Sequence, residues 1–116
     1  MIYRILMVTT IGLDSIKTEL LNENKPVLVA CISSDVFFAE IKQTLENISY
    51  RFAGVVKIYL LNQNSLNAFC AAYDIDGTPT FLIMNHGKEL DRFMGEADES
   101  TLVAIIQSIL PSFQRK

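Results

Sequence analysis

The two cysteines are the residues best suited to covalent chemistry, because a thiolate is both a nucleophile and a metal ligand. Cys31 and Cys70 lie far apart in the sequence and form no Cys-x-x-Cys pair. With the lone His86 they have no zinc-binding spacing. A disulfide-stabilised secreted domain would carry more cysteines. The sequence therefore predicts buried free thiols in a cytoplasmic protein, with no metal and no other cofactor.

A second place for chemistry is the junction at Ser33-Ser34-Asp35, where an apolar run meets a helical pattern. A helix N-terminus offers free backbone N–H groups and a positive dipole end, which favour a thiolate or a phosphate. The next residues, Val36 to Ala39, have hydrocarbon side chains, and none can be a nucleophile, a proton carrier or a metal ligand. Asp35 has no paired carboxylate, histidine or lysine nearby in the sequence, so we expect it to cap the helix.

Two other polar features are expected to be structural. His86 falls in the turn sequence NHGK, where a solvated side chain is expected. Three acidic residues, Glu96, Asp98 and Glu99, precede the last helical pattern. They suit the positive end of that helix and need no ligand.

These residues are carried by an alternating series of predicted elements. Strands are predicted over Ile2–Val8, Val27–Ile32, Val55–Leu61, Thr80–Met84 and Glu89–Met94. Helices are predicted over Leu13–Leu21, Asp35–Phe52 and Ser65–Tyr73, and a last helix is predicted to start near Asp98. The order βαβαβαββα predicts an α/β fold, in which a mixed sheet is flanked by helices, as a single domain over residues 1–116.

Length and composition limit the class of protein. The chain has 116 residues, of which 50% are hydrophobic and 20% charged, and this is typical of one globular domain. A net charge of −3 argues against nucleic-acid binding, and no apolar run is long enough to span a membrane. The first residues imitate a signal peptide weakly, but they lack a basic cluster and a small-residue cleavage site, so a strand is preferred there.

The segment DGTPTFLIMNHGK, over Asp76–Lys88, resembles the part of the thioredoxin family that carries its cis-proline, the following strand and a tight turn. Together with the order of elements, the resemblance covers nearly the whole chain. It implies a thioredoxin-like fold with a cis bond before Pro79, and a Thr78 backbone that is free to pair with an extended peptide. Gly95 occupies a place where the family also has a glycine.

The family's redox residues are missing at the matching positions. The resemblance places its two cysteines at Val36 and Ala39, its buried aspartate at Ala30 and that aspartate's lysine partner at Leu60. The tryptophan, glycine and proline of the family's motif fall on Asp35, Phe37 and Phe38. Without thiols a buried carboxylate has no proton to move, and burying an unpaired charge is costly. The chain therefore resembles a divergent member that lacks the CxxC motif and is redox-inactive.

Three functional hypotheses follow from this resemblance. The first is a protein-binding or peptide-binding module whose surface around Pro79 consists of Asp35, Val36, Phe37, Thr78, Pro79 and Gly95. The second is a thiol-disulfide oxidoreductase in cell redox homeostasis that uses a relocated cysteine, Cys31. The third is a structural domain whose apolar rim forms a homodimer. Phe37 lies about 100° around the helix from the buried side of Phe38, so it is expected at the exposed rim; the alternative is packing against the loop after Met94.

Overall fold

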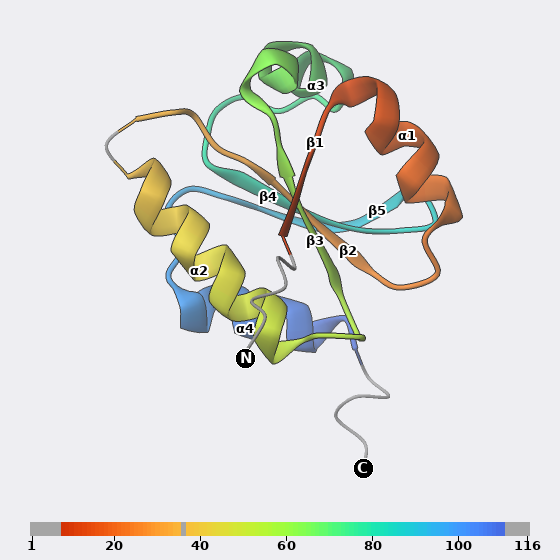
Figure 1. Cartoon of the computed structure of the whole chain (residues 1–116), viewed down its shortest axis with the longest axis vertical. Coiled ribbons are helices and arrows are strands. Elements are labelled where there is room, and N and C mark those ends of the chain that lie inside the picture. Colours follow the sequence, from red (N-terminus) through yellow and green to blue (C-terminus); the bar gives the residue numbers. More distant parts are fainter. Residues whose placement is uncertain (1–7, 36, 111–116) are drawn as a thin grey trace, which may run out of the picture.

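The structure is a computed structural model that describes residues 8–35 and 37–110. Five strands form one mixed sheet in the order β1-β3-β2-β4-β5, and helices cover both of its faces (Figure 1). The strands are β1 (Val8–Ile11), β2 (Val27–Cys31), β3 (Lys57–Leu61), β4 (Thr80–Asn85) and β5 (Lys88–Met94). The helices are α1 (Leu13–Asn22), α2 (Phe38–Arg51), the 3₁₀ helix η1 (Gln63–Ser65), α3 (Leu66–Ala72) and α4 (Glu99–Ser108). The predicted α/β class and order of elements are confirmed.

The central strand β2 is apolar along its whole length because helices cover both of its sides. It pairs in parallel with β3 and antiparallel with β4. Leu28 and Ala30 belong to the core under α2 and α4, whereas Val29 and Cys31 belong to the core under α1 and α3. Successive side chains of a strand alternate between the two faces, so this one strand contributes to both halves of the core.

Helix α2 begins at Phe38, later than the predicted start at Asp35, because Asp35 forms a turn of its own. The Asp35 carboxylate accepts a hydrogen bond from the Phe37 N–H at 3.0 Å, and the Asp35 carbonyl accepts one from the Phe38 N–H at 3.1 Å. Phe37 is therefore the residue at the N-cap. The expected cap at Asp35 is corrected to a turn just ahead of the helix.

The buried stripe of α2 follows the predicted spacing. Leu45, Ile48 and Phe52 are fully buried, and Phe38 and Ile41 are partly buried against the same cluster. Each fully buried side chain of this size contributes about 1.5–3 kcal/mol relative to an exposed one. The stripe therefore fixes the rotation of α2 and, with it, the direction in which Phe37 points.

Other helices and strands begin or end at residues that differ from the predicted ones, and local hydrogen bonds explain two of these differences. Strand β3 begins at Lys57, because the N–H groups of Val55 and Val56 both donate to the Phe52 carbonyl and close a turn after α2. The predicted helix from Ser65 divides into η1 and α3, and the Asn62 side chain caps η1 by accepting from the Ser65 N–H at 2.9 Å. The predicted strand over Ile2–Val8 lies, apart from Val8, outside the described residues.

The hairpin between β4 and β5 has the expected turn at His86 and Gly87. Both residues have left-handed backbone angles, with φ of 54° and 79°. His86 is exposed there. Pro79 and His86 lie beyond opposite ends of β4, so the only histidine of the chain is remote from the surface around Pro79.

Candidate functional site

Three loops meet at one end of the sheet and form the surface that we call the Pro79 rim. They are residues 33–35 and Phe37 before α2, the segment Gly77–Pro79 before β4, and the segment from Gly95 to Asp98 before α4 (Figure 1). Val36, which was expected at this surface, lies outside the described residues. The other predicted site residues, Asp35, Phe37, Thr78, Pro79 and Gly95, are all in these loops.

Thr78 and Pro79 lie between the other two loops. The peptide bond between them is cis. The hydroxyl oxygens of Thr78 and Ser33 lie 2.6 Å apart, in a hydrogen bond that joins the rim to the loop after β2. On the other side, the Gly95 N–H donates to the Pro79 carbonyl at 2.8 Å. The segment is thus fixed at both ends.

The backbone of Thr78 has no partner of its own in the described part of the chain. Thr78 is exposed, and its N–H and C=O make no hydrogen bond with another described residue. The neighbouring Gly77 carbonyl, by contrast, accepts from the Thr80 hydroxyl at 2.6 Å. The Thr78 backbone therefore has one donor and one acceptor without a partner among the described residues, and strand-like pairing with a second chain uses such groups.

Gln63 fixes the loop before α2 from the side. Its amide nitrogen donates to the Ile32 carbonyl at 2.7 Å, and its amide oxygen accepts from the Ser34 N–H at 3.1 Å. Sequence reasoning missed this residue and also the bond between Ser33 and Thr78. No local pattern indicates either contact, since the partners come from separate elements that only the tertiary fold brings together.

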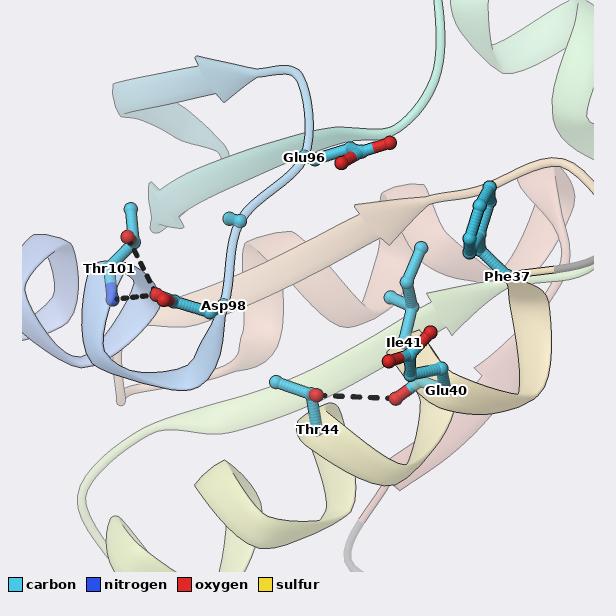
Figure 2. A pocket seen from close by; sticks show the side chains of 8 residues that line it. Phe37, Glu40, Ile41, Thr44, Glu96, Asp98 and Thr101 are labelled. Carbon is cyan, nitrogen blue, oxygen red and sulfur yellow. Dashed lines mark hydrogen bonds between the residues drawn. The ribbon is translucent and has the colours of Figure 1, made fainter.

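Phe37 is at the mouth of a pocket beside the rim. Phe37 is 52% exposed. The pocket has a volume of about 500 Å³ and lies between α2 and the loop that leads into α4 (Figure 2). Its lining consists of Phe37, Glu40, Ile41, Thr44, Glu96, Ala97, Asp98 and Thr101. Phe37 is therefore half exposed, and it lines this pocket together with Glu96 and Ala97 of the loop after Met94.

Beneath the rim the core is hydrocarbon at the positions where the resemblance placed an acid and its lysine. Ala30 and Leu60 are direct partners across β2 and β3, and both belong to the cluster under α2 and α4. Ala30 also pairs with Phe81 on β4. Ala39, at one of the mapped cysteine positions, is exposed on the first turn of α2. In the described part of the chain this place therefore has no group that could accept or release a proton for a thiol.

Both cysteines are free, and both belong to the other half of the core. Cys31 is fully buried. Burial, together with the neighbouring Cys70, raises the pKa of the Cys31 thiol to about 12. Burial also raises the pKa of Cys70. A thiol needs exposure and a lowered pKa to act as a nucleophile, and Cys31 has the reverse of both.

One polar group near the rim has a structural role at the start of α4. Asp98 caps α4, and its carboxylate accepts from the Thr101 N–H at 2.9 Å. This bond and those from the Thr101 and Ser100 hydroxyls hold the pKa of Asp98 below its usual value. Among the described residues no cluster of three or more potential ligands could hold a metal ion. None of the helices in the described ranges is both long and apolar enough to cross a membrane.

Comparison with known proteins agrees with this geometry. No curated protein matches the chain. A solved structure, entitled "Crystal structure of a designed protein", is 21% identical, with a TM-score of 0.77 over 88% of this chain and 91% of that one. At this identity the likeness shows the fold alone. The family model described as Thioredoxin matches residues 8–108. Because that match includes every strand and helix of the described residues, the chain belongs to the thioredoxin family.

Proposed function

We propose that this protein is a redox-inactive member of its family that binds an extended protein segment at the Pro79 rim. The observation that carries the proposal is the exposed Thr78 backbone, whose N–H and C=O have no hydrogen-bond partner among the described residues. An extended segment that pairs with this residue gains hydrogen bonds without breaking any within the described fold.

The surroundings of Thr78 supply the other requirements of such a site. Phe37 offers an exposed aromatic side chain, and aromatic residues commonly dominate the energy of protein interfaces. The space beside Gly95 is open, because apart from its two chain neighbours no described atom lies within 4 Å of the place where a side chain would begin. Hydrogen bonds with Ser33 and Gly95 hold the Thr78–Pro79 segment in place. A fixed site loses less conformational entropy on binding.

The redox-inactive part of the proposal rests on two observations: the apolar core beneath the rim, which we call the floor of the rim, and the burial of Cys31. The floor contains Ala30 and Leu60 where proton transfer would need polar groups. Cys31 is buried with a raised pKa. These observations disfavour a thiol-disulfide oxidoreductase that uses Cys31. We also propose a cytoplasmic location, because both cysteines are free thiols and reducing compartments maintain thiols in that form.

Two assays test the proposal. In the first, the protein is mixed with insulin and dithiothreitol, and no acceleration of insulin reduction is expected. In the second, a displayed random peptide library without cysteine is selected on the immobilised protein. Selected peptides should bind the unmodified protein and lose affinity for Phe37→Ala. Insulin reduction that disappears in Cys31→Ser would favour the oxidoreductase, and self-association that Phe37→Ala abolishes would favour a homodimer.

A further inference from the structure

We propose that the pocket beside Phe37 receives a lysine or arginine side chain of the segment that binds at the Pro79 rim. This inference rests on the proposed function and names the chemistry of the partner. The pocket and the rim share Phe37, and the pocket lining continues from Gly95 into Glu96 and Ala97. A segment that crosses Phe37 can therefore place one side chain in the pocket while its backbone pairs at Thr78.

All the charged side chains that line the pocket are acidic. Three lining residues, Glu40, Glu96 and Asp98, carry carboxylates, and the lining contains no lysine, arginine or histidine. Hydrogen bonds from Thr101 and Ser100 stabilise the ionised form of Asp98. The pocket thus has a negative field at neutral pH, which is complementary to a cationic side chain.

Two of these carboxylates have no ion-pair or hydrogen-bond partner among the described residues. The side chains of Glu40 and Glu96 make no ion pair or hydrogen bond with another residue in ranges 8–35 and 37–110. Two other glutamates do have partners: Glu99 lies 3.5 Å from the Arg51 guanidinium, and Glu89 is paired with Arg92. The pocket therefore contains acceptors that a bound cation can use without displacing an existing partner.

The shape of the lining selects a long side chain over a bare ion. Glu96 and Asp98 come from the loop before α4, while Glu40 comes from α2 on the opposite wall (Figure 2). Phe37, Ile41 and Ala97 supply apolar surface between them. Within the described residues the carboxylates form no group that could hold a metal ion. Apolar walls suit the methylene stem of lysine or arginine, and an aromatic face attracts the charged end.

The test uses the displayed peptide library selected on the immobilised protein. The peptides that bind should share a lysine or arginine at one fixed position. Replacing that residue by norleucine in the best synthetic peptide should weaken binding about tenfold, as expected for the loss of a charged contact in a partly exposed site. Glu96→Gln and Glu40→Gln should each weaken binding of the unmodified peptide. The matched control is Asp14→Asn on α1, which removes the same charge on the opposite face of the sheet and should leave affinity unchanged.

The outcomes separate this inference from the proposed function. Peptides that lose affinity for Phe37→Ala but show no basic preference would overturn the pocket's role and leave the rim intact. Equal effects of Glu96→Gln and Asp14→Asn would also overturn it, because the effect would then be one of net charge. If no selected peptide is sensitive to Phe37→Ala, both the rim and the pocket proposals fail.

Discussion

The hydroxyl oxygens of Ser33 and Thr78 lie 2.6 Å apart, so the residue ahead of Pro79 is hydrogen-bonded to the loop that follows β2. The bond is exposed, and it joins segments that are distant in the sequence. Among the described residues, neither hydroxyl is hydrogen-bonded to an acidic or basic side chain. The bond therefore positions the Thr78 backbone.

Removing this bond should loosen the rim slightly. Ser33→Ala is expected to lower the free energy of unfolding by about 0.5–1.5 kcal/mol at most, because the bond is exposed to water. Urea unfolding measures the change. The matched control is Ser34→Ala, since Ser34 bonds Gln63 through its backbone N–H and its hydroxyl has no hydrogen-bond partner among the described residues. Equal losses in the two variants would show that the hydroxyl pair contributes nothing.

Restoring an acid beneath the rim should destabilise the fold. Ala30→Asp would place a carboxylate in an apolar cluster, opposite Leu60 instead of a lysine. The cost of burying an unpaired charge is about 3 kcal/mol or more. Burial would raise the pKa of the new group, so the cost should grow as pH rises above the acid's unfolded pKa.

The control for this variant is Ala39→Asp, on the exposed first turn of α2. A negative charge there suits the helix dipole and should be tolerated. Urea unfolding of both variants at about pH 4 and pH 7 gives the comparison, with the lower value near the unfolded pKa of aspartate. Similar stability of the two variants at pH 7 would mean that the floor of the rim is not the closed apolar cluster described above.

Cys31 should react with alkylating reagents only when the protein unfolds. Its pKa of about 12 leaves roughly one thiol in ten thousand ionised at pH 8, and the side chain is fully buried. The measurement is the rate of iodoacetamide labelling at pH 8, by mass spectrometry, in a Cys70→Ser background. Labelling of the folded protein as fast as in urea would contradict the burial of Cys31 and favour the hypothesis that Cys31 is redox-active.

Arg92 should stabilise the turn after α3 and make the fold sensitive to acid. Its guanidinium binds Glu89 at 2.6 Å and 2.9 Å and donates to the carbonyls of Tyr73 and Asp74 at 2.9 Å and 3.0 Å. Arg92→Met is expected to cost about 1–3 kcal/mol, and Glu89→Gln should cost less because the carbonyl contacts remain. The comparison is made by urea unfolding at neutral pH.

The pH dependence follows from the lowered pKa of Glu89. Because the hydrogen bond from Arg92 lowers that pKa in the folded state, the pair's stabilisation is present above the ordinary value of 4.5 and is lost as pH falls through the lowered value. Glu89→Gln should therefore show a smaller loss of stability in this acid range than the unmodified protein. An identical acid profile in the two proteins would contradict the assigned role of the pair.

Much of the fold could be predicted from the sequence, because its signals are local. The continuous apolar run of β2 and the three-and-four spacing of α2 indicated their elements directly. The predicted start of α2 at Asp35 was wrong. Asp35 is a residue type that often caps helices, but here its carboxylate forms a turn ahead of the helix. Helix propensity alone does not separate these two uses of an aspartate.

The site was predicted less completely, because it depends on contacts between distant segments. The resemblance to the family indicated Thr78, Pro79 and Gly95. It did not indicate that Gln63 fixes the loop before α2. The acidic cluster before α4 was interpreted as one dipole-stabilising group, yet its members differ: Asp98 caps the helix, Glu99 pairs with Arg51, and Glu96 lines the pocket. Only the packing of α2 against this loop distinguishes them.

The central claim is that the Pro79 rim binds an extended protein segment, and Phe37→Ala tests it most directly. Titration calorimetry with the best selected peptide should show roughly thirtyfold weaker binding, the effect of truncating a central aromatic anchor. Leu90→Ala, which truncates an exposed side chain on β5, should bind normally. Melting curves of both variants should match that of the unmodified protein, because both side chains are about half exposed. Unchanged affinity in Phe37→Ala, or a variant that fails to fold, would contradict the claim.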